Sequence, residues 1–140
     1  MISAKMQKAL NTHLNEEFYS SYLYLSMAAY FEAKNLKGFA NWMRIQANEE
    51  QMHGMKFFNF ILQKGGKVTL AEIAAPKIEW KLIPEVFADT LKHKQKISGL
   101  INKLVEVAMT EKDYATNTFL QWFVTEQVEE ESNVEEIVQK

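Results

Sequence analysis

A carboxylate and an imidazole, those of Glu50 and His53, stand one helical turn apart within a segment of strong helical periodicity. Steps of three and four residues through this segment trace a single stripe: Phe39, Met43, Gln46, Glu50, His53, Phe57 and Phe60. Such a stripe is the face of an amphipathic helix that packs into a core. Burying a carboxylate costs several kcal/mol or more unless a partner or a metal compensates its charge. Metal coordination is therefore the chemistry that the pair favours, although E-x-x-H also occurs by chance on solvated helix faces.

The same polar spacing occurs in both halves of the chain, which makes chance a poor explanation. Three polar residues in each half lie on apolar stripes with the offsets 33 and 36: Glu17, Glu50 and His53, then Lys94, Gln127 and Glu130. A bundle with pseudo-twofold symmetry would bring the two sets together at its middle. Oxygen-rich ligands with one imidazole suit Fe(II), Mn(II) or, less selectively, Zn(II).

Two long helices are expected to position the first set. The first runs from about Ser3, an N-cap residue, to about Ala33. Its stripe is Leu10, Leu14, Glu17, Ser21, Tyr24, Ala28 and Phe31. Asn35 to Gly38 predicts a tight turn, and the second helix runs from about Phe39 to Lys64, where Gly65-Gly66 ends it. At 1.5 Å per residue each helix is roughly 40 Å long.

The second set requires another helical pair, reached by a long connection. Lys67 to Pro84 holds no long helical stripe, and Thr69-x-x-Glu72 predicts a capping box for at most a short turn. A third helix begins near Pro84, and Asp113 is the candidate N-cap of a fourth. Their stripes are Phe87, Leu91, Lys94, Ser98, Ile101, Val105 and Ala108, then Thr116, Leu120, Phe123, Gln127, Glu130, Val134 and Ile137. The pattern predicts an all-α four-helix bundle with one long crossover between the second and third helices.

Composition narrows the class of protein. A chain of 140 residues predicts a single domain, residues 1–140, and a net charge of −2 gives no case for a nucleic-acid partner. The absence of cysteine excludes a thiolate metal site. We expect no signal peptide at the N-terminus, and the most apolar run, Tyr22 to Phe31, is far shorter than the roughly 20 residues of a membrane span. The expected location is cytoplasmic, without a membrane partner.

Four stretches of the chain form a more specific pattern. They are Glu17 with Tyr19 to Met27, Gly38 to Met43, Glu49-Glu50-x-x-His53, and Phe119 to Glu131. Together they resemble the bacterial and archaeal non-haem ferritins over essentially the whole chain. The resemblance implies a ferritin-like bundle that oxidises Fe(II) with dioxygen, as a ferroxidase, and stores Fe(III) as a mineral. It also implies a homo-oligomer, a hollow shell of twenty-four subunits.

The resemblance implies a non-haem di-iron site within the bundle. Glu17, Glu50 and His53 would bind the first iron, and Glu50 would bridge to a second iron, whose other ligands are Glu130 and the residue at position 94. Gln127 would lie beside the site, and Tyr24 would be a nearby phenol donor. A third iron site would use four carboxylates: Glu49, Glu126, Glu129 and Glu130.

Haem is not expected. Bacterioferritins have E-x-x-H in the fourth helix and a haem-binding Met directly after the glutamate of the second helix. Here the fourth helix has Gln127 and Glu130, and Gln51 follows Glu50, so Met52 is expected to pack in the protein.

Three further glutamates are expected at the surface: Glu131, Glu135 and Glu136. His13, one turn before Glu17, is either an extra ligand or, the favoured alternative, partly exposed or hydrogen-bonded.

Lys94 departs from the family pattern, which has a carboxylate at that position. An ammonium about 5 Å from a divalent ion opposes binding by several kcal/mol even at an effective dielectric near 20. Lys94 could swing away, lose its proton, or pair with Glu50 or Glu130 and replace the charge of the second iron. The alternative function is therefore a non-catalytic or attenuated shell subunit in which Lys94 blocks the second site.

The second departure is the end of the sequence at Lys140. Family members continue beyond this point, completing the fourth helix and adding a short fifth one at the fourfold axis. The resemblance therefore implies that a fifth helix is absent, with wider openings, a looser shell or a smaller oligomer.

Overall fold

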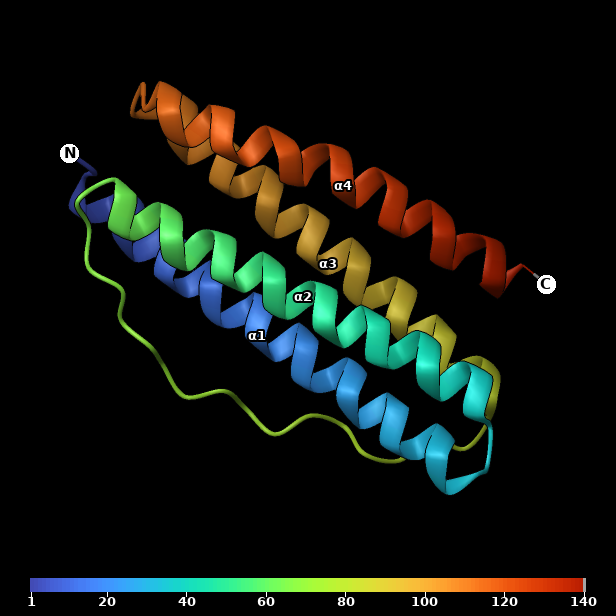
Figure 1. The fold of residues 1–140 in the computed structure, drawn as a ribbon. Helices are drawn as coiled ribbons and strands as arrows, with labels where there is room; N and C mark the ends of the chain where they lie inside the picture. The colour runs from blue at the N-terminus through green and yellow to red at the C-terminus, as the bar shows by residue number, and fades with distance from the viewer. Residues whose placement is uncertain (140) are drawn as a thin grey trace. The chain divides into compact units, whose positions relative to one another are not determined.

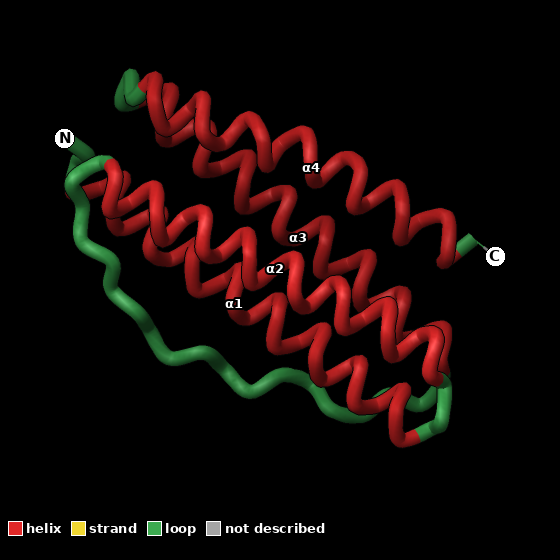
Figure 2. Tube along the Cα trace, viewed as in Figure 1, coloured by secondary structure: helices red, strands yellow, loops and turns green. Residues whose placement is uncertain are grey.

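The computed structural model describes residues 1–139, and every regular element among them is an α-helix (Figures 1 and 2). The helices are α1 (Ala4–Ala33), α2 (Lys37–Gln63), α3 (Ile83–Thr110) and α4 (Tyr114–Val138). The chain divides into two compact units, Met1–Glu79 with α1 and α2, and a second that begins at Trp80 with α3 and α4. None of the described helices is long and apolar enough to cross a membrane.

The first unit is an antiparallel helical hairpin whose ends were largely predictable. The Ser3 hydroxyl caps α1 by accepting a hydrogen bond from Met6 N at 3.1 Å. At the far end of α2, Gly65 adopts a positive φ of 75° and Gly66 N donates to Ile61 O at 2.8 Å. These contacts confirm the predicted N-cap and the predicted glycine end.

The start of α2 differs from the prediction by two residues. Asn35 alone makes the left-handed turn, with φ 59°, and Ala40 N already donates to Leu36 O at 3.0 Å. The first helical hydrogen bond therefore starts at Leu36, and Gly38 lies inside the helix and not in the turn. An exposed first turn tolerates glycine, so its presence was a misleading breaker signal.

The crossover from Lys64 to Leu82 has no helical turn, so the predicted turn at Thr69-x-x-Glu72 is wrong. The backbone N–H of Thr69, which a capping box would pair with Glu72, donates to Asn11 Oδ1 at 2.8 Å. Asn11 Nδ2 also donates to Lys67 O at 2.9 Å, and Ser26 Oγ donates to Lys77 O at 2.7 Å. Side chains of α1 thus satisfy the crossover backbone, which runs beside the first hairpin (Figure 1).

The second unit is also an antiparallel hairpin. Trp80 anchors its start because the indole Nε1–H donates to Asp89 Oδ2 at 2.8 Å. Asp113 caps α4, accepting from Thr116 N at 3.1 Å and from the Thr116 hydroxyl at 2.7 Å, which confirms the predicted N-cap. Pro84 lies in the first turn of α3, as expected of a residue without an N–H.

Of the 28 residues in the four predicted stripes, 20 are buried, seven are half-buried and one is exposed. Ser20 is buried in place of Ser21, which is half-buried and donates its hydroxyl to Ala47 O across the hairpin at 2.7 Å. Phe39 is exposed, because it lies in the first turn of α2. The six polar residues that share the offsets of 33 and 36 are all buried, as predicted.

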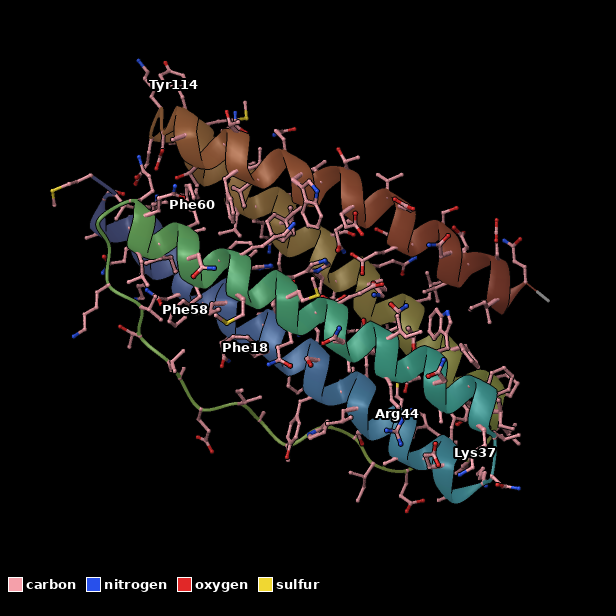
Figure 3. The ribbon with its side chains drawn as sticks, in the orientation of Figure 1. Phe18, Lys37, Arg44, Phe58, Phe60 and Tyr114 are labelled. Carbon is pink, nitrogen blue, oxygen red and sulfur yellow. The ribbon has the colours of Figure 1, made fainter. Side chains whose placement is uncertain are left out.

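Helices α1 and α2 approach each other closely at Gly54, so a larger side chain there should affect stability. A Cβ at Gly54 would lie 2.5 Å from Phe18 Cε1, whose side chain is drawn in Figure 3. Gly54→Ala should therefore lower the free energy of unfolding by about 1–2 kcal/mol, measured by urea denaturation. Gly99→Ala is the matched control, since nothing lies within 4 Å of its added Cβ. That variant should gain about 0.5–1 kcal/mol from helix propensity, and equal effects of both substitutions would contradict the packing argument.

Candidate metal centre

Three buried side chains of the first unit converge at the middle of the hairpin. Glu17 comes from α1 and Glu50 and His53 from α2, and their exposed fractions are 0%, 2% and 4%. His53 Nδ1 lies 3.2 Å from Glu50 Oε2 and 3.9 Å from Glu17 Oε2. One donor atom from each residue lies within 4.8 Å of the other two. The structure thus brings together the three residues of the first predicted set.

Helix geometry explains this convergence. Residues three apart share a helix face, so Glu50 and His53 point the same way from α2. The short turn Lys34–Leu36 makes α1 run antiparallel to α2, which places Glu17 opposite them. The bond from Ser21 Oγ to Ala47 O joins the helices close to the cluster. A regular helix pair, and not a mobile loop, therefore positions the donors.

The donor spacing suits one bound cation. Two donors, each bound to an ion at roughly 2.1 Å, lie about 3.0–3.5 Å apart when the angle between them is about 90–110°. The 3.2 Å separation of His53 Nδ1 and Glu50 Oε2, a hydrogen bond in this structure, also fits this range. The 3.9 Å separation of His53 Nδ1 from Glu17 Oε2 needs only a small adjustment. Glu17 Oε2 is buried and accepts no hydrogen bond from the described residues. Two carboxylates and a neutral imidazole would balance a divalent ion, and the donor set suits Fe(II), Mn(II) or Zn(II).

His13 is buried beside this cluster and is hydrogen-bonded, which confirms the favoured alternative of the sequence analysis. Its Nε2 lies 3.3 Å from Glu17 Oε1, the oxygen that does not approach His53. The imidazole also packs on Phe57, with ring centroids 4.7 Å apart. His13 is not one of the three residues whose donor atoms cluster.

The second predicted set forms an ion pair and a hydrogen-bond network within the second unit. Lys94 Nζ donates to Glu130 Oε1 at 2.7 Å, and the exposed fractions of the two side chains are 2% and 6%. Of the alternatives for Lys94, the structure therefore has the pairing with Glu130. Gln127 Nε2 donates to Lys94 O and to Ser98 Oγ, both at 3.1 Å. The Gln127 amide thus links α4 to α3.

Glu131 was expected at the surface, and this expectation is wrong. The residue is half-buried and its carboxylate accepts a short hydrogen bond from the Ser98 hydroxyl. The signal was present in the sequence, because Ser98 and Glu131 have the same offset of 33 as Lys94 and Gln127. Met52 is also exposed, so its expected packing is wrong for the described chain.

The remaining predicted site residues differ in burial. Tyr24 is fully buried on α1, while Glu49 on α2 and Glu126 on α4 are half-buried. Glu129 is exposed, and Glu135 and Glu136 are exposed as expected. Glu126 and Glu130 lie four residues apart on α4, so they share one face of that helix.

Comparisons with known proteins identify the family of the chain. The Ferritin-like domain family matches residues 7–140. The bacterial non-heme ferritin of Staphylococcus aureus (strain USA300) is 42% identical over 135 residues, which are 96% of this chain and 81% of the relative. The bacterial non-heme ferritin of Staphylococcus epidermidis is likewise 42% identical over 135 residues, with the same coverage of 96% and 81%.

Solved structures give the same result for the fold. An open pore ferritin from the hyperthermophilic archaeon Archaeoglobus fulgidus has a TM-score of 0.98 and 51% identity, covering 100% of this chain and 86% of its own. Chlorobium tepidum ferritin has a TM-score of 0.96 and 38% identity, covering 99% of this chain and 85% of its own. These matches confirm the predicted all-α, ferritin-like four-helix-bundle class. Sequence and structure together show that the chain belongs to the ferritin family.

Proposed function

We propose that this chain is an iron-storage ferritin subunit that binds Fe(II) at Glu17, Glu50 and His53 and acts as a ferroxidase. Dioxygen accepts the electrons released by Fe(II), and the Fe(III) product passes to a mineral stored inside a homo-oligomeric shell. The family supports iron storage and the shell, with twenty-four subunits as the proposed number. A cytoplasmic location is part of the same proposal.

The observation that supports the iron site is the burial of two carboxylates around one imidazole nitrogen. Without a cation, two buried negative charges would oppose folding by several kcal/mol. A divalent ion offsets this cost, and hard anionic oxygens stabilise Fe(III) more than Fe(II), which favours loss of an electron at this position. In the structure His53 Nδ1 is hydrogen-bonded to Glu50 Oε2. To bind the ion, this nitrogen would have to be unprotonated, because a protonated nitrogen has no lone pair to donate.

A second candidate function is an attenuated or non-catalytic shell subunit, and the Lys94–Glu130 pair favours it. In the proposed di-iron site, Glu130 is the ligand that the second hairpin supplies to the second iron. The Lys94 ammonium already binds that carboxylate at 2.7 Å. An ion at the second position must therefore displace a buried ion pair and then remain near an ammonium. We propose that the first iron site is intact and the second is weakened, so that oxidation is slow.

The other predicted site residues have secondary roles in this proposal. Tyr24 is a buried phenol donor near the iron. Gln127 lies beside the site, and its amide donates hydrogen bonds to Lys94 O and Ser98 Oγ. Glu49, Glu126, Glu129 and Glu130 form the proposed third iron site. Glu49 and Glu126 are half-buried and Glu129 is exposed, which suits carboxylates that release iron toward a cavity. Haem has no place in this scheme.

Removal of one ligand tests the first site. Glu50→Gln keeps the side-chain size and removes the charge, so Co(II), used as a probe of the site, should lose at least about 100-fold in affinity. The thermal stabilisation by saturating Co(II), about 2.7 kcal/mol at a concentration of 100 Kd, should disappear with it. Without metal, the variant should unfold no more easily than the parent, because one of two buried negative charges is gone.

The matched control is Glu106→Gln, which removes an exposed carboxylate from α3. This variant should respond to Co(II) as the parent does. Unchanged Co(II) affinity in Glu50→Gln would refute the proposed site, because the cluster would then not be the place where the ion binds.

Lys94→Glu tests the proposed weakening of the second site. The substitution restores a carboxylate at position 94 and removes the opposing ammonium, so the chain should bind an additional Fe(II) under anaerobic conditions. Stopped-flow absorbance after mixing with dioxygen should show oxidation that is at least about tenfold faster. A tenfold change in rate corresponds to about 1.4 kcal/mol, which is a modest part of the repulsion of several kcal/mol that the substitution removes.

Lys94→Met is the control, because it removes the ammonium without adding a ligand. This variant should gain no additional Fe(II), and it should lose about 3–5 kcal/mol of stability by leaving Glu130 without its ammonium partner. Full di-iron stoichiometry and rapid oxidation in the unaltered protein would instead show that Lys94 does not weaken the second site.

A further inference from the structure

We infer that His13 is a positioning residue for Glu17: its Nε2–H binds one carboxylate oxygen and directs the other toward the metal position. The inference rests on the proposed iron site and adds a residue outside the predicted ligand set. It explains how a lone carboxylate on α1 can be oriented toward the two donors of α2.

The geometry separates the two oxygens of Glu17. Oε1 lies 3.3 Å from His13 Nε2, whereas Oε2 lies 3.9 Å from His53 Nδ1 and accepts no hydrogen bond from the described residues. An ionised carboxylate can only accept hydrogen bonds, so Nε2 of His13 must carry the proton. His13 therefore acts as a donor in this pair, and its Nε2 has no lone pair to offer a metal.

The surroundings of His13 fix its ring. The side chain is buried, and its imidazole is tilted by 46° against Phe57 of α2 at a centroid distance of 4.7 Å. His13 and Glu17 are four residues apart on α1, and His53 and Phe57 are four residues apart on α2. The contact between His13 and Phe57 therefore lies one turn from the contact between Glu17 and His53, and each contact supports the other.

This arrangement has a consequence for metal affinity. A carboxylate free to rotate about its terminal bond presents either oxygen, and the entropy of fixing it opposes binding. A hydrogen bond to Oε1 removes this freedom before the ion arrives and favours coordination through Oε2 alone. Hydrogen-bond partners of metal ligands typically contribute 10–100-fold in affinity.

The experiment compares His13→Gln with His13→Leu in the full chain, using Co(II) as the probe. Glutamine can donate its amide N–H to a glutamate one turn later on a helix, whereas leucine fills the space and donates nothing. Affinity is measured by calorimetry, and the ligand-field absorption of bound Co(II) reports its coordination. We expect His13→Leu to bind Co(II) about 10–100-fold more weakly and His13→Gln to keep the affinity within about threefold, with an unchanged spectrum.

Two results would overturn the inference. Parent-like affinity in His13→Leu would show that the hydrogen bond does not matter. Equal losses in His13→Gln and His13→Leu would show that the imidazole itself is required, as in direct ligation. Should His13→Leu fail to fold, His13→Asn replaces it, because its amide is one methylene too short to reach Glu17 and the same outcomes apply.

Glu50→Gln separates this inference from the proposed function. If Glu50→Gln leaves Co(II) binding intact, the iron site itself is wrong. If Glu50→Gln abolishes binding while His13→Leu does not weaken it, the iron site stands and only the role of His13 fails.

Discussion

Burial of charge at the middle of each hairpin is the constraint on which the rest of the structure depends. A carboxylate removed from water needs a nearby cation, and the two hairpins meet this need differently. Glu17 and Glu50 face an imidazole nitrogen, an arrangement that a divalent ion would complete. Glu130 faces the Lys94 ammonium at 2.7 Å, a cation supplied by the chain itself. Removing either member of the buried Lys94–Glu130 pair would cost about 3–5 kcal/mol, so this arrangement resists change.

The helix ends follow from local chemistry that acts within a few residues. Ser3 and Asp113 cap helices because their side-chain oxygens reach the N–H three residues on, and Gly65 ends α2 because it tolerates a positive φ. These features were predictable from the sequence. The hydrogen bond of Thr69 N–H was not predictable, because its acceptor is Asn11, on a distant part of the chain. No local sequence pattern shows that Asn11 takes the place of Glu72 as the acceptor.

The candidate site, too, was predictable from the sequence only in part. Periodicity alone predicts that Glu17, Glu50 and His53 are buried on facing stripes, and the structure brings their donor atoms together. Periodicity cannot choose among the partners of a long, flexible side chain, so the pairing of Lys94 with Glu130 remained one alternative of several. The distance of 2.7 Å between Lys94 Nζ and Glu130 Oε1 shows that the structure has this pairing.

A lysine ammonium, which is attached to the chain, and a metal ion, which can leave, suit different tasks. The Lys94 ammonium is attached to the chain, so under the proposed function it would neutralise Glu130 without being exchanged for another ion. Under the proposed function, iron would have to leave the first site, and the first hairpin would then have to tolerate periods when two buried carboxylates lack an ion. The hydrogen bond between His13 and Glu17 and the contact of His13 with Phe57 would preserve the donor geometry through those periods. Turnover at the proposed site would therefore require support from neighbours that are not themselves ligands, and His13 and Phe57 are placed to give that support.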